Sequence, residues 1–283
     1  MNKRVLELLS IVDDINSIDD QIWYEGLTAR KKAELEFHDR DRDPDFVEGS
    51  QANDTYEKFY GNKKYYNITQ RSQNYVQSWI SENAKGKVFL DYACGNGGNA
   101  ILAAKSGASL ALGLDISSVS VKNAQLAADN SNLEKCKFFQ ADAENTKLPD
   151  NSIDTIICSG MLHHLDLSYA FPELRRILKP GGKLLAVEAL DYNPLIKIYR
   201  ILTPEMRTEW EKAHILNLND LKFAERFFSL GQIKYWHVLG YIAGKFPILR
   251  KPTDLLDRFL EATPLLNRMA WMFTFELIKK EDK

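Results

Sequence analysis

The chain has 283 residues, of which 45% are hydrophobic, 27% charged and 11% aromatic. This length corresponds to one large globular domain, or to one domain with a substantial extension. This composition excludes a disordered chain. Lys and Arg number 37 and Asp and Glu number 39, so the formal net charge is −2. The sequence therefore has no overall positive field to hold nucleic acid or an anionic membrane, although it leaves room for a local basic patch.

The cysteines and the N-terminal segment indicate the compartment. Cys94, Cys136 and Cys158 are odd in number and lack CxxC spacing, which argues against a disulfide framework or a structural zinc site. The apolar segment near the start is interrupted by Glu7, and no small-residue cleavage site follows it. No stretch approaches the ~18 uncharged residues of a membrane-spanning helix. We expect a soluble, cytoplasmic protein with no membrane span and, in the absence of an HExxH motif or clustered carboxylates, no metal.

Residues 1–84 are predicted to form a helical N-terminal extension that covers the rest of the chain as a lid. Apolar residues recur there at helical spacing, and a helix stop follows at 83–87, with Gly86 as the residue after the C-cap. The mixed-charge stretch 38–45 is interpreted as a solvated loop. The first helical stripe consists of Val5, Leu8, Leu9, Val12 and Ile15.

Residues 87–190 alternate short apolar runs with helical segments. This rhythm is typical of βαβ units, which form a parallel sheet covered by helices on both faces and bind ligands at the carboxyl ends of the strands. The predicted helices span 99–106, 118–130 and 168–178. The predicted strands are 88–92, 110–115, 136–140, 153–158 and 183–188.

The last part of the chain is predicted to complete the same sheet. Strand-like runs lie at 233–241 and 271–278, and helices are predicted at 194–202, 219–228 and 253–269, with a charged loop at 203–212. The connection after the fifth strand is longer than a plain αβ loop. We therefore expect a ligand-binding domain over 85–283 that carries a helical lid insertion at 191–230.

A glycine-rich loop follows the first predicted strand. From Gly95 it matches GxGxxA, a dinucleotide pattern, whereas from Asp91 it matches DxAxGxG. A carboxylate at Asp91 would repel a pyrophosphate lying over the turn but would suit a ligand with a sulfonium and an ammonium. Asp91 therefore favours S-adenosylmethionine (SAM) over a nicotinamide dinucleotide.

Two later strand ends agree with an adenosyl ligand. Asp115 can accept hydrogen bonds from both ribose hydroxyls, and Ile116 would flank the adenine. Asp142 can accept from the adenine amino group while the Ala143 backbone N–H donates to a ring nitrogen. This pairing selects adenine.

The ordered set of motifs over roughly residues 60–190 resembles the class I SAM-dependent methyltransferases. The motifs are 91-DYACGNG-97, 114-LDIS-117, 141-ADAE-144 with 148-LPDNSID-154, 160-GMLHHL-165 and 178-LKPGGK-183. The resemblance implies a doubly wound, Rossmann-like α/β fold whose seven-stranded sheet is mostly parallel, with its last strand antiparallel. It also implies SAM as methyl donor and S-adenosylhomocysteine as product.

The resemblance places Ala93, Gly95, Gly97 and Ser159 around the cofactor. Ala93 departs from the glycine common in the family; its methyl group is tolerated if φ is negative, but it could tilt the methionyl end of the cofactor. Relatives also fold a segment like 59–69 over the cofactor. This gives Tyr65 a cofactor-contacting role and Tyr66 a role near the transferred methyl, with ordinary packing an equal alternative.

Several residues are candidates for the acceptor side of the reaction. His163 or His164 could act as a general base, but in such a loop a histidine often packs or bonds to the backbone. Glu188 and Asp191 follow the fifth strand and either face the cleft or cap the next helix. Arg200 or Arg207 could clamp an acidic acceptor, although arginines in a charged loop are more often solvated.

The function predicted is methyl transfer from SAM to a small-molecule acceptor, a metabolite or natural product, most plausibly at a hydroxyl or carboxylate oxygen. Methylation of nitrogen, carbon, a peptide or a protein remains open, as does a non-catalytic SAM-binding protein. Nucleic acid is not expected as a partner, because the chain has no basic excess and no Asn/Asp-Pro-Pro-aromatic motif. The aromatic runs near the C-terminus could form strand core, an apolar acceptor pocket or a homodimer surface.

Overall fold

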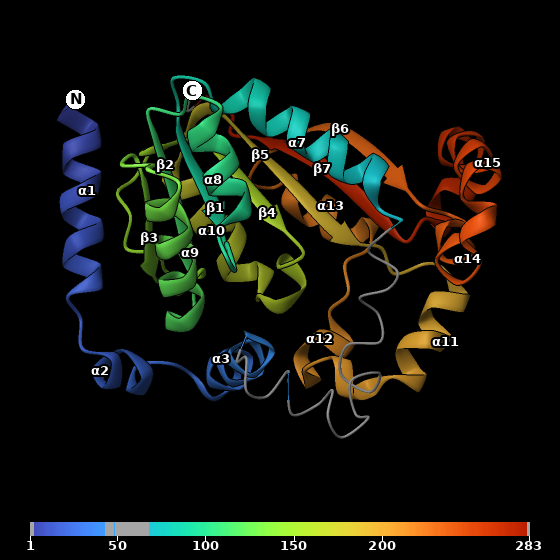
Figure 1. Ribbon diagram of the computed structural model, residues 1–283, viewed down its shortest axis with the longest axis horizontal. Helices are drawn as coiled ribbons and strands as arrows, with labels where there is room; N and C mark the ends of the chain where they lie inside the picture. The colour runs from blue at the N-terminus through green and yellow to red at the C-terminus, as the bar shows by residue number, and fades with distance from the viewer. Residues whose placement is uncertain (1–2, 43–47, 49–67, 282–283) are drawn as a thin grey trace.

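The computed structural model describes residues 3–42, 48 and 68–281 (Figure 1). Its centre is a seven-stranded sheet in the order β3-β2-β1-β4-β5-β7-β6, in which only β7 runs antiparallel to its neighbours. The predicted doubly wound α/β fold is therefore confirmed. The strands are β1 (Val88–Tyr92), β2 (Leu110–Asp115), β3 (Cys136–Gln140), β4 (Ile153–Ser159), β5 (Leu178–Ala189), β6 (Ser229–Trp236) and β7 (Met272–Ile278).

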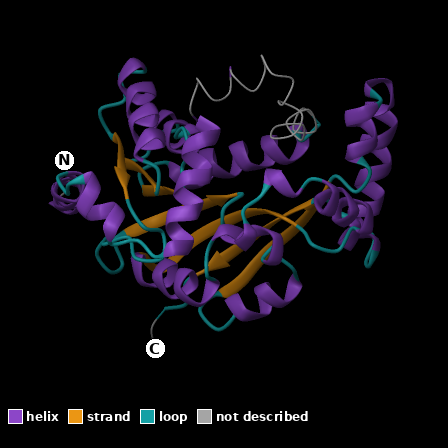
Figure 2. Cartoon of the chain, turned by 90° about the horizontal axis from the view of Figure 1, so that it is seen from below, coloured by secondary structure: helices purple, strands orange, loops and turns teal. Residues whose placement is uncertain are grey.

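Helices cover both faces of this sheet because its central strands are apolar on both sides. Alternate residues of β1 illustrate the division: Phe89 packs with one set of helices, and Leu90 with the other. The first set is α7 (Gln70–Ala84), α8 (Gly98–Lys105) and α9 (Ser118–Asn130); the second is α1 (Lys3–Asn16), α10 (Leu167–Ile177) and α13 (Leu218–Ala224). Figure 2 shows the sheet enclosed between helices.

Helix α1 lies beside β3 at the edge of the sheet (Figure 1). Val5, Leu8 and Val12 are almost fully buried in the core, as their helical spacing predicts. Asn16 at the helix end donates to the Phe138 carbonyl at 3.1 Å and accepts from the backbone N–H of β3 at 3.4 Å. The helix thus covers an exposed strand edge, where backbone groups would otherwise lack partners.

The remaining helical segments lie around the carboxyl ends of the strands and at the β6 end of the sheet (Figures 1 and 2). In the described residues no helix combines the length and the apolar composition needed to cross a bilayer. The segments are α2 (Asp20–Glu25), α3 (Ala29–Arg42), η1 (Leu162–His164), α11 (Pro194–Leu202), η2 (Pro204–Met206), α12 (Glu209–Ala213), α14 (Gly240–Lys245), η3 (Pro247–Leu249), α15 (Arg250–Ala262) and η4 (Leu266–Met269).

Several local predictions were wrong. The helix predicted at 253–269 is divided into α15, which ends at Ala262, and η4, which begins at Leu266. The stretch 38–42 belongs to α3 rather than to a solvated loop, and 203–212 contains η2 and most of α12 rather than a plain loop. The strand predicted to reach residue 241 ends at Trp236. His237 has a positive φ of 63°, and its backbone N–H donates to Glu261 at 2.7 Å, so the extended chain stops there and α14 follows.

Candidate active site

The glycine-rich loop between β1 and α8 turns sharply through left-handed backbone conformations. Gly95 and Gly97 have φ values of 52° and 76°. A Cβ at Gly97 would lie 2.6 Å from the ring of Phe138, so only glycine fits. Ala93 also has a positive φ, 58°. The condition of a negative φ is therefore not met, and Ala93 stores backbone strain of about 1 kcal/mol at the cavity wall.

Asp115 at the end of β2 holds this loop in place. One carboxylate oxygen accepts from the Gly95 N–H at 2.8 Å and the other from the Ser117 N–H at 2.9 Å. The side chain lines a cavity of about 300 Å³ at the carboxyl ends of the strands. Each carboxylate oxygen has a second lone pair, so Asp115 can still accept from a ligand diol. Its ribose contact stays a prediction.

Asp91 lies behind the wall of this cavity rather than in it. It is 1% exposed, and its carboxylate accepts from the Ala100 N–H at 3.2 Å and from the Asn99 side chain at 3.4 Å, at the start of α8. Burial raises the pKa of Asp91 to about 7. Asn99 does line the cavity. Asp91 is therefore connected to the cavity by its hydrogen bond from Asn99. Its direct contact with a cationic ligand stays a prediction.

The adenine-selecting residues predicted from sequence line the same cavity. Ile116, Asp142 and Ala143 are on its wall. Asp142 accepts from the Glu144 backbone N–H at 2.9 Å and from the Lys31 ammonium at 2.6 Å. An adenine amino group would therefore share or replace the Lys31 contact.

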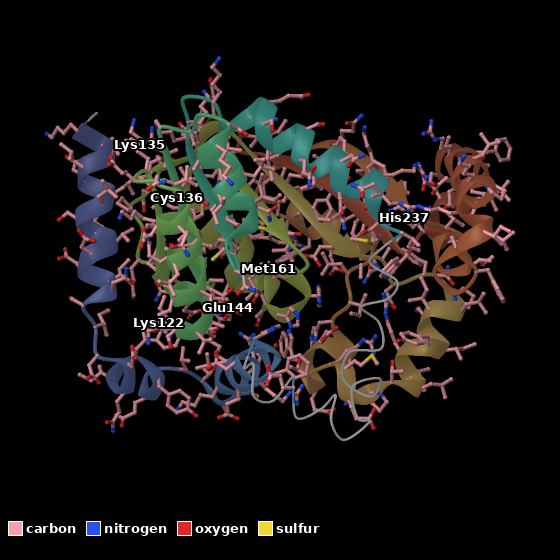
Figure 3. All side chains as sticks on the ribbon, viewed as in Figure 1. Lys122, Lys135, Cys136, Glu144, Met161 and His237 are labelled. Carbon is pink, nitrogen blue, oxygen red and sulfur yellow. The ribbon has the colours of Figure 1, made fainter. Side chains whose placement is uncertain are left out.

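Helix α3, which lies within the predicted N-terminal lid, closes this smaller cavity. Arg30, Lys31, Glu34 and His38 all line it. Arg30 donates to the His164 carbonyl at 2.9 Å and pairs with Glu144, whose second oxygen lies 2.8 Å from Lys31. Figure 3 shows Glu144 and Met161 at the end of the sheet that faces α3. Charged residues on a mixed-charge helix give no sequence signal that distinguishes such a lid from a solvated face.

A second cavity of about 630 Å³ adjoins the first, and the two share His38, Ser159, Gly160 and His164. The predicted cofactor residue Ser159 thus lies on the boundary. The larger cavity has mostly apolar walls from β5, α11, α14 and β7, with charged groups on one side. Its other lining residues are Phe37, His163, Val187, Ala189, Leu195, Ile196, Tyr199, Arg200, Met206, Arg207, Glu211, Ile215, Ile242, Phe246, Trp271 and Met272.

His163 is held from behind by a buried carboxylate. Its Nδ1 lies 2.6 Å from Glu188, which is fully buried at the end of β5. The other oxygen of Glu188 accepts from the backbone N–H groups of Met161 and Leu162 at 2.9 and 2.7 Å. A carboxylate that accepts from Nδ1 leaves Nε2 as the basic nitrogen. Nε2 lies 3.9 Å from Glu211, a cavity residue whose pKa is raised by burial.

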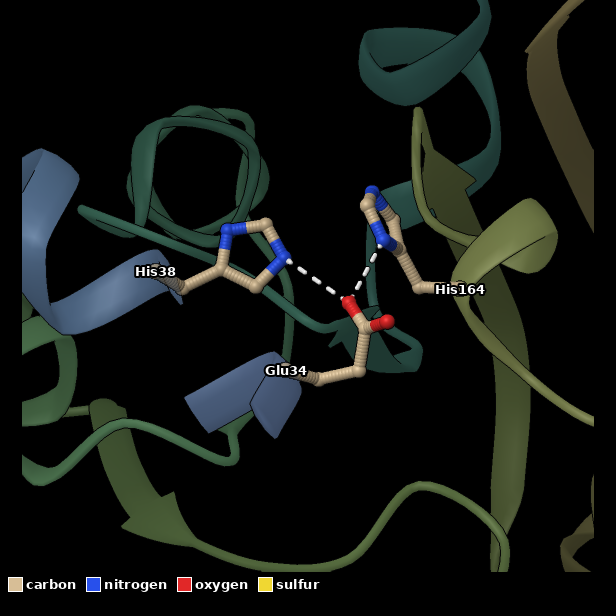
Figure 4. Close-up of side chains that lie close together, drawn as sticks. All are labelled: Glu34, His38 and His164. Atoms are coloured by element: carbon tan, nitrogen blue, oxygen red, sulfur yellow. Dashed lines mark hydrogen bonds and ion pairs between the residues drawn. The ribbon is translucent and has the colours of Figure 1, made fainter. Parts of the chain in front are cut away.

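His164 instead ties the lid helices together (Figure 4). Its Nδ1 lies 2.9 Å from Glu34 on α3, and the same carboxylate oxygen is 3.9 Å from the His38 Nε2. The other oxygen of Glu34 accepts from the Thr208 hydroxyl at 2.5 Å, at the start of α12. Glu34 therefore joins three segments, α3, η1 and α12, around the boundary of the two cavities.

These groups also have the composition of transition-metal ligands. Glu34, His38 and His164 form one set of donor atoms within 4.8 Å of one another, and His163, His164 and Glu211 form another. In the first set a hydrogen bond joins Glu34 to His164, and in the second His163 is hydrogen-bonded to Glu188, which lies outside the set. We assign no metal to either set.

The two predicted arginines line the larger cavity, but each has protein partners. Arg200 lies 3.1 Å from Asp191, and Arg207 donates to the Thr203 carbonyl at 2.9 Å. Burial lowers the pKa of Arg200. The predicted lid residues Tyr65 and Tyr66 lie outside the described residues.

Comparison with known proteins agrees with this geometry. Residues 90–186 match the family described as "Methyltransferase domain". Sterol 24-C-methyltransferase ERG6B of Gibberella zeae is 35% identical over 114 residues, 40% of this chain and 30% of that protein. The uncharacterized methyltransferase YcgJ of Bacillus subtilis is 29% identical over 125 residues, 44% of this chain and 48% of that protein. The matched region spans less than half the length of these two relatives.

Solved structures share the fold at low identity. The crystal structure of YcgJ superposes with a TM-score of 0.52 and 19% identity, covering 74% of this chain and 100% of that one. The [4+2]-cyclase SpnF gives 0.53 and 20%, covering 75% and 82%. Geranyl diphosphate methyltransferase, in complex with geranyl diphosphate and sinefungin, gives 0.54 and 12%, covering 74% and 79%. Residues 90–186 therefore match a methyltransferase domain, and the sheet around them has the fold of the class I SAM-dependent methyltransferases.

Proposed function

We propose that the chain transfers a methyl group from SAM to a hydroxyl oxygen of a small, largely apolar acceptor, with His163 as the general base. The observation that carries the proposal is the His163–Glu188 pair at the wall of the larger cavity, next to the boundary with the smaller one. A base at this point is needed for a hydroxyl acceptor. A carboxylate acceptor would need only positioning and desolvation.

The smaller cavity suits the cofactor. At about 300 Å³ it has the size of a small ligand pocket, and its wall combines carboxylates at Asp115 and Asp142 with the apolar side chain of Ile116. Asp115 would hold the ribose, and Asp142 with Ala143 the adenine. When bound there, SAM would supply a methyl group on a positively charged sulfur, so that an oxygen nucleophile bonds to the methyl carbon as the carbon–sulfur bond breaks and S-adenosylhomocysteine leaves.

The work of the protein is then to position the acceptor and take its proton. In the proposed reaction the acceptor hydroxyl gives its proton to His163 Nε2 as the oxygen forms its bond to the methyl carbon. Glu188 is fully buried and bonded to two backbone N–H groups, so it holds the imidazole in one orientation. His164 is bonded to Glu34, which also accepts from Thr208, so it links α3 to α12 and we assign it the positioning role.

The larger cavity supports an acceptor with an apolar body. Leu195, Ile196, Met206 and Trp271 are among its walls, and its arginines are already bonded to protein groups. The names of two relatives describe methylation of large organic molecules but at different atoms. One is a sterol 24-C-methyltransferase, and the other is a 27-O-demethylrifamycin SV methyltransferase from Amycolatopsis mediterranei, 34% identical over 101 residues. A metabolite or natural product of this apolar kind is the proposed acceptor.

The second candidate function is cofactor binding without methyl transfer. The specific observation in its favour is the shared fold of SpnF, which is named for a cyclisation. Calorimetry with S-adenosylhomocysteine, adenosine and NAD tests the cofactor, because both SAM functions require tight S-adenosylhomocysteine binding and no preference for NAD. Formation of S-adenosylhomocysteine with a panel of apolar hydroxylated compounds then separates enzyme from binder. Turnover with matched amines or carboxylates but not with hydroxyl compounds would contradict the proposed oxygen acceptor.

A further inference from the structure

Large apolar side chains are exposed along one end of the molecule. Of the eighteen that are exposed in the described part of the chain, twelve lie between residues 195 and 266. They come from α11, the C-cap of α14, η3, α15 and the start of η4, which lie at the end of the molecule opposite α1 (Figure 1). The most exposed are Ile201, Leu202, Ile248, Leu255, Phe259 and Leu265, at 66–90%. We refer to these six as the apolar face.

The exposed charges around the apolar face are mostly basic, although Glu205, three residues after Leu202, is an exposed acid. Within residues 194–202 and 246–268, every exposed charged side chain is basic: Lys197, Arg250, Lys251, Arg258 and Arg268. Two of the three acidic residues of α15 turn inward, and the third, Asp254, is half-buried. Asp257 is buried and accepts from a backbone N–H at 2.6 Å, and Glu261 pairs with Arg71. A helix with exposed apolar and basic residues and inward acids is the pattern of a helix that lies in a lipid–water interface.

The larger cavity opens at this same end. Leu195 and Phe246 line the cavity, and yet they are 55% and 52% exposed. They therefore belong both to its rim and to the border of the apolar face. A ligand that enters the cavity past Leu195 and Phe246 therefore comes from the environment in contact with the apolar face.

We propose that the apolar face docks on an anionic lipid surface and that the larger cavity receives its apolar acceptor from there. The docking is inferred from the exposed apolar and basic residues alone, whereas the delivery of an acceptor rests on the proposed function. Basic residues near an anionic surface each strengthen binding about five-fold, and the apolar side chains supply the insertion. The small overall charge of −2 does not oppose this, because the basic residues are gathered on one face.

A second copy of the chain is the other candidate occupant, and the charges disfavour it. A two-fold dimer through this face would set the same patch against itself. Arg250, Lys251 and Arg258 of one copy would then meet like charges, with no exposed acid in these segments to pair with them.

The test is co-sedimentation of the full chain with vesicles, without cofactor or acceptor. Vesicles of phosphatidylcholine alone are compared with vesicles that also contain phosphatidylglycerol, at low and high salt. The apolar variant Leu255→Asp/Phe259→Asp changes two neighbouring exposed positions of α15. Its matched control is Ile22→Asp/Leu126→Asp, which changes two side chains of similar exposure, 67% and 60%, on α2 and α9. Circular dichroism and thermal unfolding check that all proteins are folded.

The proposal requires stronger binding to the anionic vesicles, weakening by salt, a loss of at least about ten-fold in the apolar variant and unchanged binding in the control. Absence of binding to anionic vesicles, or an equal loss in the control, would overturn it. A wild-type dimer that the apolar variant turns into a monomer, seen by light scattering without vesicle binding, would assign the face to a second copy. Calorimetry with S-adenosylhomocysteine on the same samples shows separately whether the cofactor site has failed.

Discussion

The Glu188→Gln variant tests the proposed base most directly. The amide oxygen can keep the two hydrogen bonds from Met161 and Leu162, so the loop after β4 stays in place. The amide NH₂ then faces His163 Nδ1 at the 2.6 Å contact and can only donate to it. The imidazole must place its hydrogen on Nε2, which leaves no lone pair toward the cavity to take a proton.

The Glu188→Gln variant is expected to lose the rate contribution of general-base catalysis. Such a base contributes about 10²–10⁴ in rate, so kcat should fall by that factor, about 3–5 kcal/mol of activation free energy. Stability should fall by only about 1–2 kcal/mol, because one charged hydrogen bond is weakened while the backbone donors keep their partner. Affinity for S-adenosylhomocysteine should not change, since Glu188 does not line the smaller cavity.

The assay is formation of S-adenosylhomocysteine at saturating SAM, with the acceptor found by the screen. Glu173→Gln is a matched control: Glu173 is a buried, hydrogen-bonded carboxylate on α10 that lines neither cavity. His163→Ala should lose as much kcat as Glu188→Gln, and His164→Ala less than ten-fold. A Glu188→Gln enzyme that keeps kcat within about three-fold of wild type would refute the base assignment.

Three further predictions concern binding and stability. Asp115→Ala should weaken S-adenosylhomocysteine binding by about 2–4 kcal/mol, and Asp142→Ala by less because the Ala143 backbone donor remains; calorimetry that gives the reverse order would overturn these roles. Burial raises the folded-state pKa of Asp91 to about 7 from an ordinary value near 4. The free energy of unfolding of the wild type should therefore fall as pH rises from 4 to 7, by up to about 4 kcal/mol. Denaturant titrations of Asp91→Asn should lack this dependence on pH. Leu8→Ala should cost about 2–5 kcal/mol of unfolding free energy, because Leu8 is 1% exposed in the core; a loss under 1 kcal/mol would mean that α1 is not part of the folded core.

The sequence by itself predicted the sheet, its first five strands and several residues of the smaller cavity. These features are local: an apolar strand, a tight turn and a helix follow one another within about ten residues, and the carboxyl ends of parallel strands meet at one edge. Asp115, Ile116, Asp142 and Ala143 could therefore be placed together before the structure was known, and all four line one cavity.

Only the tertiary structure decided which groups meet across the site. Glu188 is 25 residues from His163, and Glu34 is 130 residues from His164, so no periodicity or spacing relates them. The sequence predicted an N-terminal lid but not which residues of α3 meet the site, because a charged helix that covers a site and one that faces water have the same composition. Asp91 had a clear electrostatic meaning in the sequence, yet its carboxylate bonds to the start of α8, because a strand residue points to one face of the sheet whatever its charge. Side-chain direction and long-range contact are set by packing, and packing is a property of the folded chain rather than of any segment of it.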